Sequence, residues 1–166
     1  MRKIADLKPE EVLRLAIAVE DRNEKVYKEY ATIFEDEHPE ASGIFAQMAG
    51  EEREHGQMLR TFYAQKFGHP PIKDFLEEIA EPVEAPILPD SEVFIYRDMT
   101  PDHAFDVAKK TEILAQNFYG ELSRTSKDPA LKKLYMELAE IEKGHKEEAE
   151  RLERRKKPRV GMTYFL

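Results

Sequence analysis

Two short motifs of the chain pair a carboxylate with an imidazole three residues later, Glu52-x-x-His55 and Glu142-x-x-His145. Around the first motif, the residues at helical steps of three and four are Phe45, Met48, Glu52, His55, Leu59 and Phe62. This spacing is typical of a helix face that packs into a core, so Glu52 and His55 should point inward. A buried carboxylate needs a compensating partner, and a metal ion is one of the few that satisfies Glu and His together. The motif therefore predicts a buried metal site.

The same pattern occurs twice in the chain. Each motif follows a helical stretch with a single inward glutamate, Glu20 before the first motif and Glu112 before the second. The stretch around Glu20 recurs with a shift of 92 residues, and the stretch around His55 recurs around His145 with a shift of 90. Such a repeat predicts two helix pairs related by a pseudo-twofold axis. That arrangement would bring four carboxylates and two imidazoles to one place, where four negative charges balance two divalent cations.

The chain contains no cysteine, so any metal must bind oxygen and nitrogen ligands. Carboxylate and imidazole donors without sulfur suit iron or manganese, and zinc would compete because it binds such donors more tightly. The lack of cysteine also excludes disulfides, thiolate zinc sites, iron–sulfur clusters and a thiol nucleophile. The sequence therefore predicts two metal ions on carboxylate and histidine ligands.

The elements that must position these residues are four long helices. Helical periodicity, with a proline at the first turn of each stretch, predicts helices over residues 9–36, 39–67, 101–126 and 129–156. The composition favours amphipathic helices over sheet, because 36% of the residues are charged and only 7 of 166 are glycine. We therefore expect an all-α fold, a four-helix bundle in a single domain spanning residues 1–166.

Residues 68–100 form a long connection that is rich in proline. Within it we expect a short amphipathic piece at 74–80 and an extended apolar piece at 93–96. So long a connection is unusual in a compact domain, and its natural role is a crossover between helices at opposite ends of a bundle. The last segment, residues 157–166, has no helical pattern.

Charge and hydropathy restrict the partners. The formal net charge of -8 at pH 7 argues against nucleic acid, because phosphate binding needs a basic face. No apolar stretch approaches the about 20 residues of a membrane span, and the first residues lack a signal-peptide pattern. The sequence therefore predicts a cytoplasmic protein that binds neither nucleic acid nor membrane.

Some residues near the motifs allow a simpler interpretation. Glu35 and His38 have the Glu-x-x-His spacing too, but they lie at a helix end and we interpret them as solvated. Glu24 is the best candidate for an extra acid near the site, although its counterpart in the repeat is Gln116. We therefore leave these four residues out of the predicted ligand set.

Tyr27 and Tyr119 lie two helical turns from Glu20 and Glu112 and face the same way. They are either ordinary core aromatics or hydroxyl groups that hydrogen-bond to a ligand carboxylate and hold it in place. Both interpretations stay open from the sequence alone.

The six predicted ligands resemble the ligand set of the ferritin-like di-iron carboxylate superfamily, and among its members that of the rubrerythrins most. These ligands are Glu20, Glu52, His55, Glu112, Glu142 and His145. The resemblance covers all four helices and the crossover. It implies two irons bridged by Glu52 and Glu142, with Glu20 and Glu112 as outer carboxylates.

By the same resemblance, His55 and His145 would each bind one iron. Rubrerythrins reduce hydrogen peroxide to water at a diferrous site, and their electrons usually arrive from a rubredoxin. The resemblance therefore implies a di-iron oxidoreductase of oxidative-stress defence, acting on peroxide or dioxygen. We expect a homodimer.

The chain departs from the rubrerythrins in two respects. It has no cysteine, so the fused rubredoxin domain is missing and an external donor such as a rubredoxin must supply the electrons. Rubrerythrins also carry a further carboxylate one turn after the ligand of the third helix, where this chain has Ala115. A six-ligand site is closer to the ferroxidase centres of bacterioferritins.

Two other functions therefore stay open. The protein could be a ferroxidase that feeds iron to a store inside a cage, or cargo that docks residues 162–166 on a shell protein. Alternatively, it could be a metal-binding bundle without turnover, in which zinc would serve as well as iron.

Overall fold

The computed structural model describes residues 3–71 and 99–156, apart from the side chains of Ala5 and of residues 146–156. The described elements are a short 3-10 helix, η1, and four long helices: η1 (Ile4–Asp6), α1 (Pro9–Ile33), α2 (Pro39–Phe67), α4 (Pro101–Thr125) and α5 (Pro129–Lys156). The described residues contain no strand. The all-α prediction is therefore confirmed.

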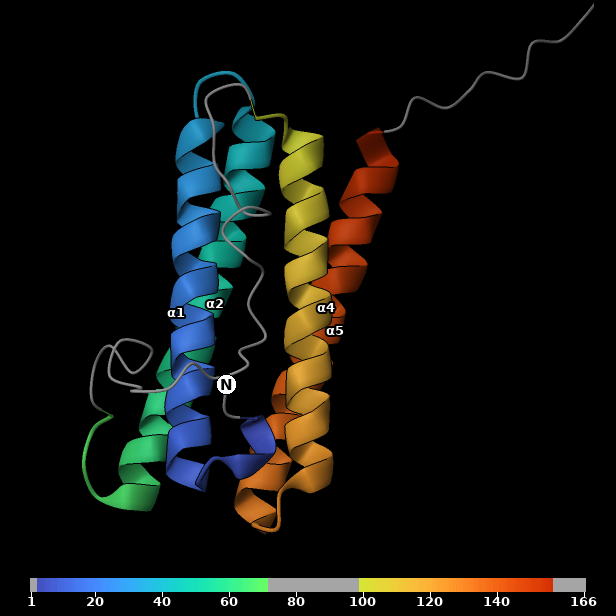
Figure 1. Ribbon diagram of the computed structural model, residues 1–166. Helices are drawn as coiled ribbons and strands as arrows, with labels where there is room; N and C mark the ends of the chain where they lie inside the picture. The colour runs from blue at the N-terminus through green and yellow to red at the C-terminus, as the bar shows by residue number, and fades with distance from the viewer. Residues whose placement is uncertain (1–2, 72–98, 157–166) are drawn as a thin grey trace, which may run out of the picture. The chain divides into compact units, whose positions relative to one another are not determined.

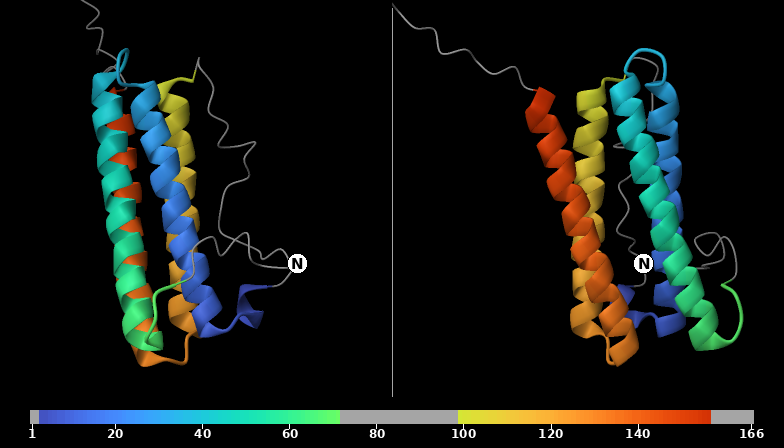
Figure 2. Two further views of the ribbon diagram at one scale, coloured as in Figure 1. Left: turned by 90° about the vertical axis from the view of Figure 1, so that its left-hand side faces the viewer. Right: turned by 180° about the vertical axis from the view of Figure 1, so that it is seen from behind.

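The chain divides into two compact units, residues 1–101 and 102–166. The first unit contains the hairpin of α1 and α2, called the first hairpin below. The second contains α5 and nearly all of α4, called the second hairpin. Figures 1 and 2 show α1 beside α2 and α4 beside α5, each pair antiparallel and joined by a short turn. Each hairpin therefore positions its own share of the predicted ligands.

Each long helix begins at a proline, as predicted. Proline suits this position because its fixed φ is helical and its missing N–H has no partner in a first turn. At the start of α1, the Glu11 carboxylate accepts a hydrogen bond of 2.8 Å from the Lys8 amide. At the start of α5, Asp128 Oδ1 accepts from the amides of Ala130 and Leu131 at 2.9 and 3.2 Å. Asp128 is therefore the N-terminal cap of α5.

The ends of the helices differ slightly from the prediction. α1 ends at Ile33, three residues before the predicted end, because Phe34 has a φ of -92° and a ψ of 1° that leave the helix. The chain then turns, and the His38 amide donates to the Phe34 carbonyl at 2.9 Å. α2 ends at Phe67, as predicted, and the next residue is Gly68, whose φ of 79° is easily reached only by glycine. α4 ends one residue before the predicted 126.

The buried face of α1 follows the predicted spacing. Its members are Leu13, Ala16, Glu20, Asn23, Tyr27, Tyr30 and, just past the helix end, Phe34. The aromatic rings of this face pack around one residue of α2, because the ring of Phe45 lies 5.1 Å from that of Tyr30 and 5.8 Å from that of Phe34. Burial of an aromatic side chain of this size contributes about 1.5–3 kcal/mol to folding. This packing fixes the register between α1 and α2.

The second hairpin has a comparable interior. The buried residues of α4 include a set at helical steps of three and four, and they are Phe105, Ala108, Glu112, Ala115, Tyr119 and Leu122. Across the hairpin, the rings of Tyr119 and Tyr135 are stacked with centroids 6.3 Å apart. Leu131, Tyr135 and Leu138 of α5 are buried as well.

The predicted crossover pieces at 74–80 and 93–96, and the segment 157–166, lie outside the described residues. Among the helices that the structure describes, none has a stretch of the length and apolar character needed to cross a membrane.

Candidate metal centre

The first hairpin brings Glu20, Glu52 and His55 together, a group called the first trio below. Glu20 comes from the middle of α1, and the other two come from α2. His55 Nδ1 lies 3.4 Å from a carboxylate oxygen of Glu20 and 3.5 Å from one of Glu52. The exposed fractions are 0% for Glu20, 1% for Glu52 and 5% for His55. One atom of each residue lies within 4.8 Å of the other two.

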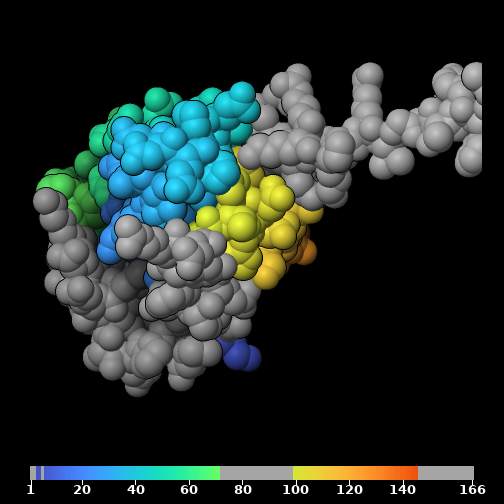
Figure 3. Space-filling model, turned by 90° about the horizontal axis from the view of Figure 1, so that it is seen from above, coloured from blue at the N-terminus to red at the C-terminus, as the bar shows by residue number. Residues whose placement is uncertain are grey.

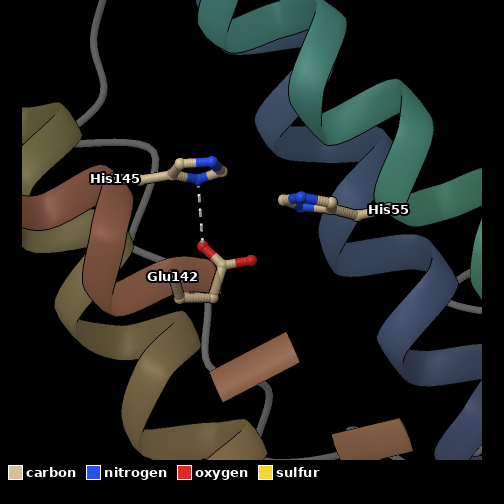
Figure 4. A group of neighbouring side chains, drawn as sticks. All are labelled: His55, Glu142 and His145. Atoms are coloured by element: carbon tan, nitrogen blue, oxygen red, sulfur yellow. Dashed lines mark ion pairs between the residues drawn. The ribbon is translucent and has the colours of Figure 1, made fainter. Parts of the chain in front are cut away.

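The second hairpin brings Glu112, Glu142 and His145 together in the same way, as the second trio. His145 Nδ1 lies 3.6 Å from a carboxylate oxygen of Glu112 and 3.7 Å from one of Glu142. Figure 4 shows the latter contact as a dashed line between two side chains of α5, and it also shows the imidazole of His55 on α2. Both glutamates are fully buried, and the His145 side chain is 15% exposed.

The carboxylates make each trio strongly negative. For His145, burial lowers the pKa, but the hydrogen bonds and charges of Glu112 and Glu142 outweigh it and raise the pKa to about 10. The raised pKa means that the two carboxylates favour a positive charge at this position. A metal ion would supply that charge in place of the proton.

The donor sets fit a metal ion in each hairpin. Ligand atoms bound at about 2.1 Å from one ion lie about 3–3.5 Å apart, close to the observed spacing of imidazole nitrogen and carboxylate oxygen. Two carboxylates and one imidazole without sulfur suit iron, manganese or zinc. The buried Glu and His groups of both hairpins could therefore hold metal.

The first trio has a feature beside it that the sequence did not predict. Arg60 of α2 makes an ion pair with Asp21 of α1, the residue after Glu20, in which Arg60 Nη2 donates to both carboxylate oxygens. A Cβ atom at Gly56, the residue after His55, would lie 2.8 Å from the Arg60 guanidinium and 3.6 Å from the Glu20 Cβ. The absence of a side chain at Gly56 therefore leaves room for the Arg60 side chain next to the trio, whereas α1 would lie at ordinary contact distance from a Cβ there.

The other sequence candidates stay outside the trios. Glu24 is partly buried, and it forms an ion pair of 2.5 Å with Lys28, one turn further along α1. Glu35 and His38 are exposed, which confirms that they are solvated, and Figure 3 shows the turn between α1 and α2 on the molecular surface. Gln116, the counterpart of Glu24, is partly buried.

Tyr27 and Tyr119 are fully buried, so both belong to the cores of their hairpins. Their predicted hydrogen bonds to ligand carboxylates stay a prediction. Asn23 of α1 lies on the same face as Glu20, three residues further along, and it is not among the six predicted ligands. It is 6% exposed, and its Nδ2 has no hydrogen-bond partner among the described residues.

The predicted six-ligand site therefore appears as two trios of the same composition, one in each hairpin. The structure describes each hairpin by itself. That the two trios share one pair of metals stays a prediction, based on the internal repeat and on the balance of four carboxylates with two divalent ions.

Comparisons with known proteins extend over both hairpins. A family model described as Rubrerythrin matches residues 11–153. A crystal structure of an uncharacterized conserved protein from Magnetospirillum magnetotacticum is 25% identical, with a TM-score of 0.69 over 95% of this chain and 100% of that one. A hypothetical protein from Pyrococcus furiosus is also 25% identical, with a TM-score of 0.67 over 91% of both chains. A search of curated proteins finds no match. The predicted ferritin-like class is thereby confirmed.

Proposed function

Because this chain belongs to the rubrerythrin family, we propose that it is a di-iron carboxylate oxidoreductase that reduces hydrogen peroxide, or dioxygen, in oxidative-stress defence. One observation carries the proposal: a buried trio of two glutamates and a histidine occurs in each hairpin at the same spacing. Four buried carboxylates need positive charge, and two divalent ions supply the amount that neutralises them.

The six residues have distinct roles in this proposal. Glu52 and Glu142, from the Glu-x-x-His motifs, would be shared by the two irons, and His55 and His145 would hold one iron each. The remaining carboxylates, Glu20 and Glu112, would each hold one iron as well. Two ferrous ions held by these residues would supply the two electrons that, with two protons, convert one hydrogen peroxide to two waters.

The chain itself supplies position, charge and exclusion of water. The full burial of Glu20 and Glu112 keeps bulk water away from the ligands and strengthens their electrostatic interactions. Tyr27 and Tyr119, buried two turns from these glutamates, would donate hydrogen bonds that hold the carboxylates in place. With no cysteine in the chain, electrons come from an external donor such as a rubredoxin.

A second candidate function has one specific observation in its favour. Ala115 is 1% exposed and lies one turn after Glu112, where rubrerythrins carry a further carboxylate. A site with six ligands is closer to a ferroxidase, which oxidises ferrous iron with dioxygen and passes it to a store. Sedimentation or light scattering separates the two, because storage requires a large hollow oligomer whereas the oxidoreductase is expected as a homodimer.

Stopped-flow absorbance tests the proposal directly. The protein is loaded anaerobically with two ferrous ions per chain and mixed with hydrogen peroxide or with dioxygen. Oxidation that is at least about 10-fold faster with peroxide supports the peroxidase. Faster oxidation by dioxygen favours the ferroxidase instead. No reaction with either oxidant would contradict both and leave a metal-binding bundle without turnover.

A further inference from the structure

The buried face of α1 carries a polar side chain that the proposed ligand set does not use, Asn23. It lies three residues after Glu20 and four before Tyr27, and it is 6% exposed. Residues three or four apart on a helix are neighbours, with Cβ atoms about 5–6 Å apart. Asn23 therefore lies directly beside a carboxylate of the first trio.

The amide group of Asn23 has a donor to spare. Its Nδ2 makes no hydrogen bond within the part of the chain that the structure describes. The neighbouring Glu20 carboxylate thus does not accept from it, although the two side chains share one face of α1. A buried N–H group that has lost its water and gained no acceptor is unfavourable, so natural proteins keep such groups only rarely. The acceptor therefore has to come from outside the described chain.

At the position that corresponds to Asn23, the second hairpin has no donor. The shift of 92 residues that relates Glu20 to Glu112 also relates Asn23 to Ala115, which is buried and apolar. The two trios repeat the same ligands, but at the position three residues after the glutamate the first hairpin has a buried amide and the second has a methyl group, with the partly buried Gln116 following one residue later. This difference gives the first hairpin a binding capacity that its repeat lacks at the same position.

We propose that Asn23 Nδ2 donates a hydrogen bond to a small molecule with an acceptor oxygen or nitrogen atom that binds beside Glu20. In the proposed function, on which this inference rests for the presence of metal, that molecule is hydrogen peroxide. The first hairpin is then the side at which the oxidant binds, and Asn23 is a residue that contacts the substrate. No bond is made or broken by Asn23 itself.

Azide serves as the probe, because it is a small anion with acceptor atoms and its binding to oxidised iron is seen by absorbance. In Asn23→Leu the donor is lost while the side-chain volume is nearly kept. The matched control is Tyr30→Phe, which also removes a buried hydrogen-bond donor without a partner from α1, about 15 Å along the helix from Glu20. Metal content is measured first, and both variants should keep two irons per chain.

The expected result is a difference between the two variants in azide affinity. For Asn23→Leu the azide Kd should rise about 10-fold, the usual effect of losing one hydrogen bond to a charged acceptor. For Tyr30→Phe it should stay within about twofold of the wild-type value. An unchanged azide Kd in Asn23→Leu would overturn the inference, and so would an equal rise in both variants.

Thermal unfolding of the metal-free protein adds a readout that does not depend on activity. If the Asn23 amide is held for a ligand, Asn23→Leu removes an uncompensated buried polar group, and the metal-free variant should unfold at a higher temperature than wild type. A lower unfolding temperature with an unchanged azide Kd would identify Asn23 as a structural residue and overturn the inference. Should Asn23→Leu misfold, Asn23→Ala, which copies Ala115, carries the same azide prediction.

These measurements separate the inference from the proposed function. Iron-loaded wild type that reacts with neither peroxide nor dioxygen would end the oxidoreductase proposal, while the azide comparison would still decide the role of Asn23. Conversely, rapid peroxide reduction together with equal azide affinity in wild type and Asn23→Leu would overturn only the inference.

Discussion

The two hairpins hold the same three ligand types at nearly the same distances, yet their surroundings differ. His55 and His145 lie 3.4–3.7 Å from the carboxylates of their own hairpins. Asn23 lies one turn beyond Glu20 in the first hairpin, where the second hairpin has Ala115 one turn beyond Glu112. Beside the first trio, an ion pair between Arg60 and Asp21 also joins α1 and α2. Charge balance and burial restrict which residue types can occupy the ligand positions, whereas the positions beside them tolerate different residues. We therefore expect the two metal positions to be chemically different.

The largest expected effect tests what the two hairpins have in common. Replacement of either proposed bridging ligand, Glu52→Ala or Glu142→Ala, should reduce metal content from two per chain to less than one, because each removes a ligand from both ions. Metal analysis after dialysis measures this loss. Glu54→Ala and Glu140→Ala are matched controls on the exposed sides of the same helices, and they should keep both metals. Full metal content in Glu52→Ala would refute the assignment of the trios.

The next effect tests the contribution of each hairpin to metal binding separately. His55→Ala and His145→Ala should each reduce the metal content to about one per chain, since each imidazole serves one ion. The exposed His38 provides the control, because His38→Ala should leave two metals bound. Titration with cobalt, followed by visible absorbance, would show which position remains filled. One histidine variant could instead lose both metals while the other loses none. The two histidines would then contribute very differently to metal binding, although their distances to the carboxylates of their own hairpins are similar.

A smaller effect concerns stability at alkaline pH, and it depends on Tyr30, near the C-terminal end of α1. Burial raises the pKa of Tyr30 to about 12, with a further contribution from Glu29, whereas the corresponding residue of the second hairpin is Leu122. In the unfolded chain the pKa is about 10. The folded state therefore favours the neutral hydroxyl of Tyr30. The resulting contribution to the free energy of unfolding is complete below pH 10 and is lost as the pH rises to 12. Over that range, stability should fall by up to about 1.4 kcal/mol per pH unit.

Urea unfolding of the metal-free wild type and of Tyr30→Phe, at intervals between pH 9 and 12, measures this contribution. The wild type should lose stability relative to Tyr30→Phe only above pH 10. A constant difference between the two proteins across this range would show that Tyr30 keeps an ordinary pKa.

The smallest effect concerns two glycines of α2. Gly50→Ala should stabilise the metal-free protein by up to about 1 kcal/mol, because alanine favours the helix and its Cβ would meet only Arg53, at 4.0 Å. Gly56→Ala should gain little or nothing, since its Cβ would displace Arg60 from its pair with Asp21. Urea unfolding compares the two variants. Equal stabilisation by both would show that the ion pair moves without cost.

Much of each hairpin could be predicted from local spacing. Steps of three and four placed Glu20, Glu52 and His55 inward, and the structure buries all of them. Prolines at the helix starts gave nearly correct bounds, because proline acts through its own backbone geometry. One predicted core residue, Phe62, is only partly buried, since it lies toward the end of α2.

Other features depend on contacts that spacing does not encode. The pair of Asp21 and Arg60 joins residues 39 apart in the sequence, and its partners look like ordinary solvated charges. The end of α1 at Ile33 depends on how Phe34 packs against Phe45, which is a tertiary contact. The spare donor of Asn23 becomes visible only once its neighbours are placed. Periodicity therefore predicts which side of a helix is buried, but not what each side chain meets there.

The presence of one complete trio in each hairpin has an evolutionary consequence. Each hairpin already combines two carboxylates and an imidazole within a single compact unit. A shorter ancestral gene encoding one hairpin would thus have specified half of a two-metal centre, and pairing of two copies would have completed it. Duplication and fusion of that gene would have freed each copy to mutate separately. The asparagine at position 23 and the alanine at position 115 would then be products of that freedom.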